Sequence, residues 1–183
     1  MAPPDGGLTV WEDLLAEGSM HLALGSALML IFGMVCERFL ITRFRWTPYF
    51  TAGFPLFPEL VPISKAPEGT GETATVHWEV VGEDGDLVRF WADPDKRRAP
   101  SGLRGAVKLY RARGGSVGLA VRWSPPWTLL LAAGWLVVLG IVRQEPQITV
   151  PIAIVWVMGV LLIYRQAALR AAAELRWAFV KGE

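Results

Sequence analysis

Few side chains in this sequence could support chemistry: two histidines, one cysteine, and an acid–base pair at the end of an apolar stretch. His21 lies near the start of that stretch, where an imidazole could ligate a haem iron or a chlorophyll magnesium. Because no second ligand stands nearby, the alternative is an imidazole that makes hydrogen bonds at a helix end. His21 is therefore only a weak cofactor-ligand candidate. We expect no intrinsic cofactor, beyond contact with lipid or with pigment of a host complex.

The other reactive side chains have simpler interpretations. His77 lies in a segment of alternating polar and apolar residues and is expected on a sheet face, with no serine, cysteine or carboxylate pattern to mark it as a base. Cys36 is expected to be a small apolar residue, with lipidation or redox sensing as alternatives. Glu37 precedes Arg38 at the end of an apolar stretch. We expect this carboxylate to reach the membrane interface, although a proton relay is the other interpretation.

The glycines and basic residues form no known cradle for phosphate. Gly102–Gly105 and Gly114–Gly115 do not open a helix after a strand, as a nucleotide-binding loop would. Lys96, Arg97 and Arg98 are expected in a solvated turn, with binding of anionic lipid as the alternative. These motifs therefore predict a protein that is not an enzyme.

Three apolar stretches of about 20 residues each, near 18–36, 123–142 and 146–164, must position these side chains. Each is long enough to cross ~30 Å of hydrocarbon as a helix. Lysine and arginine are absent before Arg38; 13 lie between the first and second stretches, one between the second and third, and four after the third. Basic residues are retained on the cytoplasmic side of a membrane. We therefore expect the N-terminus outside, with the middle segment and the C-terminus inside.

The sequence predicts an α+β membrane protein of the bacterial inner membrane, with three transmembrane helices and a small cytoplasmic antiparallel β-meander between the first two. The expected segments are an outer lead with a short amphipathic helix (1–17), the first transmembrane helix (18–42), a proline- and aromatic-rich extended segment (43–71), the β-domain (72–123), the second and third transmembrane helices (124–143 and 146–164), and a basic helical tail (165–183). Thr9 and Glu12 have the spacing of a capping box for the short helix, which Gly18 would end. Pro151 is expected in the first turn of the third transmembrane helix.

The middle segment alternates polar and apolar residues in four runs, at 75–80, 87–92, 106–111 and 116–123. This period predicts two β-hairpins that form a four-stranded meander. One face of such a sheet needs a cover, which the proline-rich segment or a partner could supply. The expected core residues are Val76, Trp78, Val80, Val107, Leu109, Leu119 and Val121.

Aromatic and basic residues at predicted membrane boundaries indicate contact surfaces. The chain has nine tryptophans, and two of them fall inside the second and third apolar stretches. A buried indole N–H needs an acceptor, which another subunit, a lipid carbonyl, a pigment or simple helix packing could supply. The residues that we expect to contact a partner or the membrane are Trp11, Phe54, Phe57, Trp135, Trp156, Arg170 and Trp177.

No ionisable residue lies in the middle of an apolar stretch, which argues against a transporter, pump or channel. A net charge of +1 gives no support to nucleic-acid binding. We therefore expect a non-catalytic accessory, structural or assembly subunit of a larger bacterial inner-membrane complex, with photosynthetic or respiratory assemblies the commonest setting. Its partners would be other membrane-protein subunits and lipids. The alternative is a stand-alone membrane-tethered module whose β-domain recognises a lipid headgroup or a protein partner.

Overall fold

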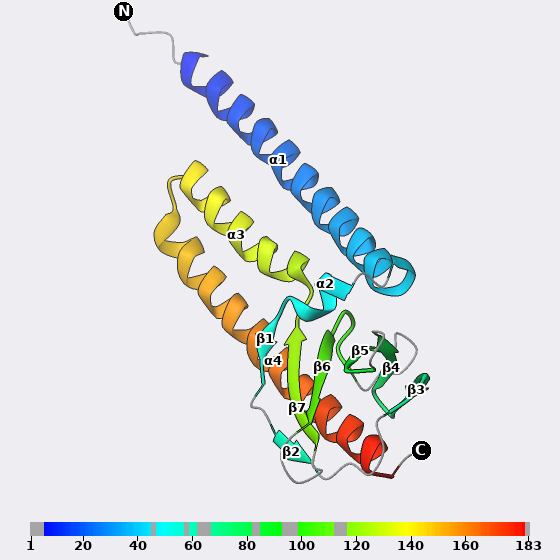
Figure 1. Ribbon diagram of the computed structural model, residues 1–183. Helices are drawn as coiled ribbons and strands as arrows, with labels where there is room; N and C mark the ends of the chain where they lie inside the picture. The colour runs from blue at the N-terminus through cyan, green and yellow to red at the C-terminus, as the bar shows by residue number, and fades with distance from the viewer. Residues whose placement is uncertain are drawn as a thin grey trace, which may run out of the picture. The chain divides into compact units, whose positions relative to one another are not determined.

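The computed structural model describes residues 6–44, 47–56, 59–61, 67–81, 85–92, 99–111 and 117–181. They form an α+β protein that divides into two units, Met1–Cys36 and Glu37–Glu183. The first unit holds most of helix α1 (Gly6–Phe39), and the second holds the end of that helix, the sheet and the remaining helices (Figure 1).

Helix α1 corrects the prediction for the N-terminal segment. We expected a short helix that ends at Gly18, but α1 continues through this residue without a break. Thr9 and Glu12 lie inside the helix, so the predicted capping box is wrong. A single glycine costs a helix only about 1 kcal/mol, and no proline interrupts the chain between Pro4 and Pro48. A π-helical turn, η1 (Leu40–Phe44), follows directly.

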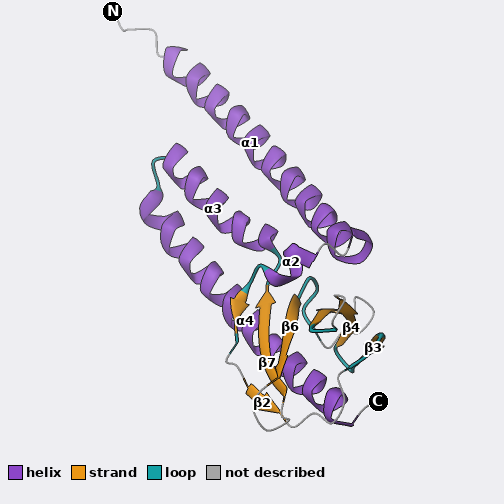
Figure 2. Cartoon of the chain, viewed as in Figure 1, coloured by secondary structure: helices purple, strands orange, loops and turns teal. Residues whose placement is uncertain are grey.

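The sheet of the second unit is antiparallel throughout, as predicted, but it is larger than the expected meander (Figure 2). Six strands follow the order β1-β7-β6-β5-β4-β3, and β2 also pairs with β7. The four predicted strands are confirmed within one or two residues. The strands are β1 (Phe54–Pro55), β2 (Glu59–Val61), β3 (Thr70–Glu72), β4 (Val76–Val81), β5 (Leu87–Ala92), β6 (Arg104–Arg111) and β7 (Val117–Ser124).

The proline-rich segment supplies the additional elements. We expected residues 43–71 to follow an extended path, but they contain helix α2 (Thr47–Thr51) and strands β1, β2 and β3. Pro48 sits at the start of α2, where the missing N–H costs nothing. Strand β1 lies at the edge beside β7, where its Pro55 is tolerated.

Each face of the sheet has its own apolar cluster. Six of the seven predicted core residues are buried, and Val80 is partly buried. The C-terminal half of helix α4 (Pro146–Lys181) covers one face through Tyr164, Leu175 and Phe179. On the other face, Ile41 and Phe50 pack with Trp91 and Ala106. The sheet is therefore covered by segments of its own chain.

Helices α3 (Trp127–Val142) and α4, which match the apolar stretches expected at 124–143 and 146–164, form an antiparallel hairpin, which Figure 1 shows as two ribbons side by side. A loop of only three residues, 143–145, joins them. Because α4 starts at Pro146, Pro151 lies inside the helix rather than in its first turn, which corrects that prediction. The predicted continuation of α4 beyond Tyr164 is confirmed.

The prediction of three transmembrane helices is confirmed only in part. Within the described residues, one helix, Pro146–Val180, is long and apolar enough to cross a membrane by length and composition. The apolar stretch of α3, Trp127–Ile141, is shorter than a full span. Among the described residues, one helix rather than the expected three therefore has the length and composition of a membrane span.

Candidate functional site: a buried ion pair beneath the helical hairpin

Glu37, which we expected at the membrane interface, is instead 5% exposed and lies at the base of α3. Its Oε1 accepts a hydrogen bond from the backbone N–H of Trp127 at 2.6 Å. Its Oε2 accepts two from Thr128, 3.1 Å from the backbone N–H and 2.6 Å from the hydroxyl. The carboxylate therefore caps a helix that starts far from it in the sequence.

Helix α3 needs this acceptor because of its own sequence. The residue in the capping position is Pro126, which makes no side-chain cap hydrogen bond. The first N–H groups of a helix have no acceptor within the helix, and a negative charge there is favourable to the helix dipole. The Glu37 carboxylate supplies both the acceptor and the charge.

Arg104 completes an ion pair with Glu37 inside the protein. Its side chain is fully buried in strand β6, and its Nη1 lies 3.0 Å from Glu37 Oε1. The guanidinium stacks over the ring of Tyr49, 3.8 Å from the ring centroid, and the Tyr49 hydroxyl donates to Glu37 Oε1. We call these four residues, Glu37, Tyr49, Arg104 and Thr128, the Glu37 cluster.

Burial governs the ionisation of this cluster. It lowers the pKa of Arg104, while the neighbouring Tyr49 and Glu37 oppose that shift. An arginine starts from a pKa so high that it keeps its charge. Burial, followed by the hydrogen bond to Glu37, raises the pKa of the Tyr49 hydroxyl, so this group stays a donor.

The geometry defines what the cluster can do chemically. Three donors approach one carboxylate oxygen of Glu37 and two approach the other. A carboxylate that is filled in this way is a poor base and a poor nucleophile. The Glu37 cluster is therefore suited to holding the end of α1, the sheet and the start of α3 together.

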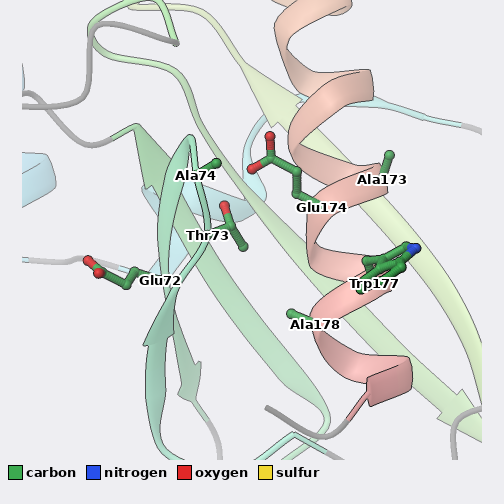
Figure 3. Close-up of a pocket in the computed structure, with 7 residues that line it drawn as sticks. All are labelled: Glu72, Thr73, Ala74, Ala173, Glu174, Trp177 and Ala178. Atoms are coloured by element: carbon green, nitrogen blue, oxygen red, sulfur yellow. The ribbon is translucent and has the colours of Figure 1, made fainter.

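A second feature is an open cleft of about 460 Å³ beside the turn between β3 and β4. Residues of the turn form one wall, and helix α4 forms the other (Figure 3). Glu174 extends from α4 towards this turn, and its Oε2 accepts hydrogen bonds from the N–H and the hydroxyl of Thr75 at 3.1 and 2.7 Å. The lining residues are Glu72, Thr73, Ala74, Ala173, Glu174, Trp177 and Ala178.

The residues that the sequence singled out are spread over several places. His21 is exposed on α1 in the first unit, and the side chain of Trp11 and all of Phe57 lie outside the described residues. Arg170 and Trp177 are exposed on α4, at different points of its second half. Within the described residues, His, Cys, Asp and Glu side chains do not gather into a group of three or more that could hold a metal ion.

The aromatic candidates have contacts within the second unit. The Trp156 indole N–H donates to the Leu129 carbonyl at 2.9 Å, which joins α4 to α3. Trp135 is 38% exposed on α3. Phe54 packs against Trp123 across the β1–β7 pair, with ring centroids 5.4 Å apart. The Trp156 contact matches the interpretation of this residue as simple helix packing.

Comparisons of the chain with protein-family models, with curated proteins and with solved structures find no match.

Proposed function

We propose that this chain is a non-catalytic accessory or assembly subunit of a larger inner-membrane complex, anchored by three membrane-spanning helices. The observation that carries the proposal is the division of α4 into two halves. In the first half, Ile152, Val155 and Ile163 are 52%, 71% and 60% exposed. In the second half, Ala168, Leu175 and other side chains are buried against the sheet. One helix thus serves as a membrane anchor and as part of the folded domain.

Helix α3 of the hairpin also fits a position in the membrane. Its 16 residues span about 24 Å, somewhat less than the hydrocarbon thickness, and bilayers accommodate such a shortfall by local thinning. Because α3 packs antiparallel along the first half of α4, a membrane that α4 crosses also contains α3. The exposed Leu131 and Ile141, on α3, fit an apolar surrounding.

Exposed apolar residues on α1 support a further span. Leu28, Met29 and Met34 are 59%, 75% and 53% exposed, and at 3.6 residues per turn they point to three different sides of the helix. A helix that is apolar on all sides belongs in a protein core or a membrane. Together with the position of the basic residues, this pattern favours an outer N-terminus and a cytoplasmic sheet.

The membrane part of the hairpin also has a feature suited to a neighbouring helix. A shallow apolar groove of about 330 Å³ runs between α3 and α4, with Ala133, Gly134 and Ala153 among its lining residues. Small residues allow helix backbones to approach closely in lipid, where packing rather than apolar burial drives association. This groove supports a role as one subunit among several.

Gentle solubilisation followed by sizing and mass spectrometry tests the proposal. We expect the chain in a stable, stoichiometric complex of high mass, whereas a free monomer or dimer of this 20.2 kDa chain would refute the subunit role. An optical spectrum of that complex tests for haem or chlorophyll, the mark of an energy-transducing assembly. On our interpretation, His21→Leu leaves the spectrum unchanged.

The cleft beside the β3–β4 turn favours a second candidate function, that of a stand-alone membrane-tethered binding module. The same sizing experiment separates the two functions. A module that acts alone would elute as a free chain and still bind its ligand.

A further inference from the structure

The sheet ends at strand β3, which forms its outer edge. Strand β3 is the last in the strand order, and no described strand pairs with its outer side. Val80 N–H donates to Gly69 O, and Thr73 N–H donates to Val76 O, both at 2.8 Å. Hydrogen bonding alternates along an antiparallel pair, so the main-chain groups of Gly71 face β4. The N–H and C=O groups of Thr70 and Glu72 therefore face outwards.

Packing around Gly71 determines what an added strand would meet. Gly71 pairs with Trp78, and a Cβ at Gly71 would collide with the Trp78 indole. Trp78 contacts Phe179 of α4, with ring centroids 5.4 Å apart. Paired residues point to the same face of a sheet, so a residue opposite Gly71 on an added strand would point towards α4.

The side chain in that position would reach the cleft between the β3–β4 turn and α4. Glu174 and Ala178 lie on the side of α4 that faces the turn, and Trp177 projects from the neighbouring side (Figure 3). The indole of Trp177 is 63% exposed. An aromatic ring beside a carboxylate is a suitable environment for a cationic side chain with an apolar stem.

Charge at the edge favours the same occupant. Glu174 lies across the cleft and Glu68 precedes β3, so acidic residues flank the open strand, whereas the Glu72 carboxylate points away from the cleft (Figure 3) and lies 3.6 Å from His77 Nδ1. The turn that forms one wall is rigid, because Thr73 Oγ1 accepts from the N–H groups of Thr75 and Val76 at 3.3 and 3.1 Å. The cleft is thus a built feature beside the strand edge.

We propose that β3 is the docking edge for an extended segment of a protein partner, which adds a strand to the sheet and places a lysine or arginine in the cleft beside Glu174 and Trp177. Main-chain hydrogen bonds to Thr70 and Glu72 would supply affinity, and the basic side chain would supply specificity. This inference rests on the proposed subunit function only in that it names the chemistry of one partner. It uses only the second half of α4, which packs on the sheet, so it can fail or succeed independently of the proposed membrane spans.

The test uses the full chain in mild detergent and a fluorescent, end-capped peptide, Lys-Val-Lys-Val-Lys, measured by fluorescence polarisation. The control peptide is Glu-Val-Glu-Val-Glu. Glu72→Pro removes an outward N–H without removing a bond to β4, and we expect it to weaken binding about fivefold. Glu174→Gln keeps an acceptor for Thr75 but removes the charge, and should weaken binding about threefold. Glu145→Gln, at the exposed hairpin tip, is the charge-matched control and should change nothing.

Hydrogen exchange of the unmodified chain gives a second readout that needs no variant. The basic peptide should slow exchange of the Thr70 and Glu72 amides, which point outwards. Equal binding of the acidic peptide, or unchanged exchange of both amides in the presence of bound basic peptide, would overturn the proposal. Failure of the basic peptide to bind at all would also overturn it, whatever the size of the native complex.

Discussion

Glu37 and Thr128 lie 91 positions apart in the sequence, yet the carboxylate of Glu37 accepts hydrogen bonds from both the backbone N–H and the hydroxyl of Thr128. The pair joins the end of α1 to the first turn of α3. Arg104 brings strand β6 into the same contact.

Replacing Glu37 with Leu leaves the Arg104 charge buried without a counter-charge. We expect the free energy of unfolding to fall by about 3–5 kcal/mol, the usual cost of breaking a buried ion pair from one side. Tryptophan fluorescence during denaturation in detergent measures the change. The double variant Glu37→Leu/Arg104→Met should recover part of the loss; additive losses would show that the two residues are not coupled.

Tyr49→Phe removes the hydroxyl that donates to Glu37 but keeps the ring beneath Arg104. We expect a loss of about 1–2 kcal/mol in the free energy of unfolding, because the buried carboxylate loses one donor. Circular dichroism melts of both proteins at neutral pH measure this loss. A difference within error would mean that the hydroxyl contributes nothing to the junction.

The raised pKa of Tyr49 makes stability depend on alkaline pH. Above the usual tyrosine pKa of about 10, the unfolded chain loses this proton while the folded chain keeps it. The stabilisation is therefore complete below about pH 10 and falls by up to ~1.4 kcal/mol per pH unit above it. Measured against Tyr49→Phe at the same pH values, the wild-type advantage should shrink on the alkaline side. An advantage that grows with pH would contradict the assignment.

We predict that the buried alanines of α4 cannot be replaced by larger residues without a loss of stability. Ala171 is fully buried against the sheet, so Ala171→Leu should overpack this contact and cost about 1–3 kcal/mol. Ala173 is exposed two residues further on, and Ala173→Leu should leave the unfolding midpoint unchanged. Equal effects of the two variants would contradict the packing of α4 on the sheet.

Membrane topology is testable with single cysteines in a Cys36→Ala background. Glu145 lies at the exposed hairpin tip and Asp86 lies on an exposed sheet turn. An impermeant maleimide should label Glu145→Cys in intact cells and Asp86→Cys only after permeabilisation. Gly85 is left unchanged because its φ of +63° favours glycine. Labelling of both positions in intact cells would rule out a hairpin across the membrane.

The sheet strands and the hairpin were predictable because local patterns specify them. Period-two alternation defined β4 to β7, and two apolar runs around a charged loop defined α3 and α4. The short strands β1, β2 and β3 were missed because two or three residues carry no period, and pairing with longer strands decides their structure.

The Glu37 cluster was missed for a different reason. The charge pair Glu37-Arg38 read as two neighbours at a membrane interface, whereas the true ion partner, Arg104, lies on a distant strand. One signal was present in the sequence: a helix that begins after Pro125-Pro126 has no side chain in its capping position and needs an acceptor from elsewhere. The alanines of α4 favour a helix in any setting, and the sequence alone does not show that their small size allows the helix to lie close to the sheet.

The continuity of α4 has a consequence for how the protein is made. The residues of α4 that cover one face of the sheet lie in its second half, so a ribosome synthesises β7, α3 and the first half of α4 before this cover exists. On the proposed topology, the β-strands therefore wait with one apolar face open while α3 and the start of α4 enter the bilayer. Insertion of the hairpin and closure of the core are thus successive steps of one biosynthetic event, and a defect in the first exposes the sheet to aggregation.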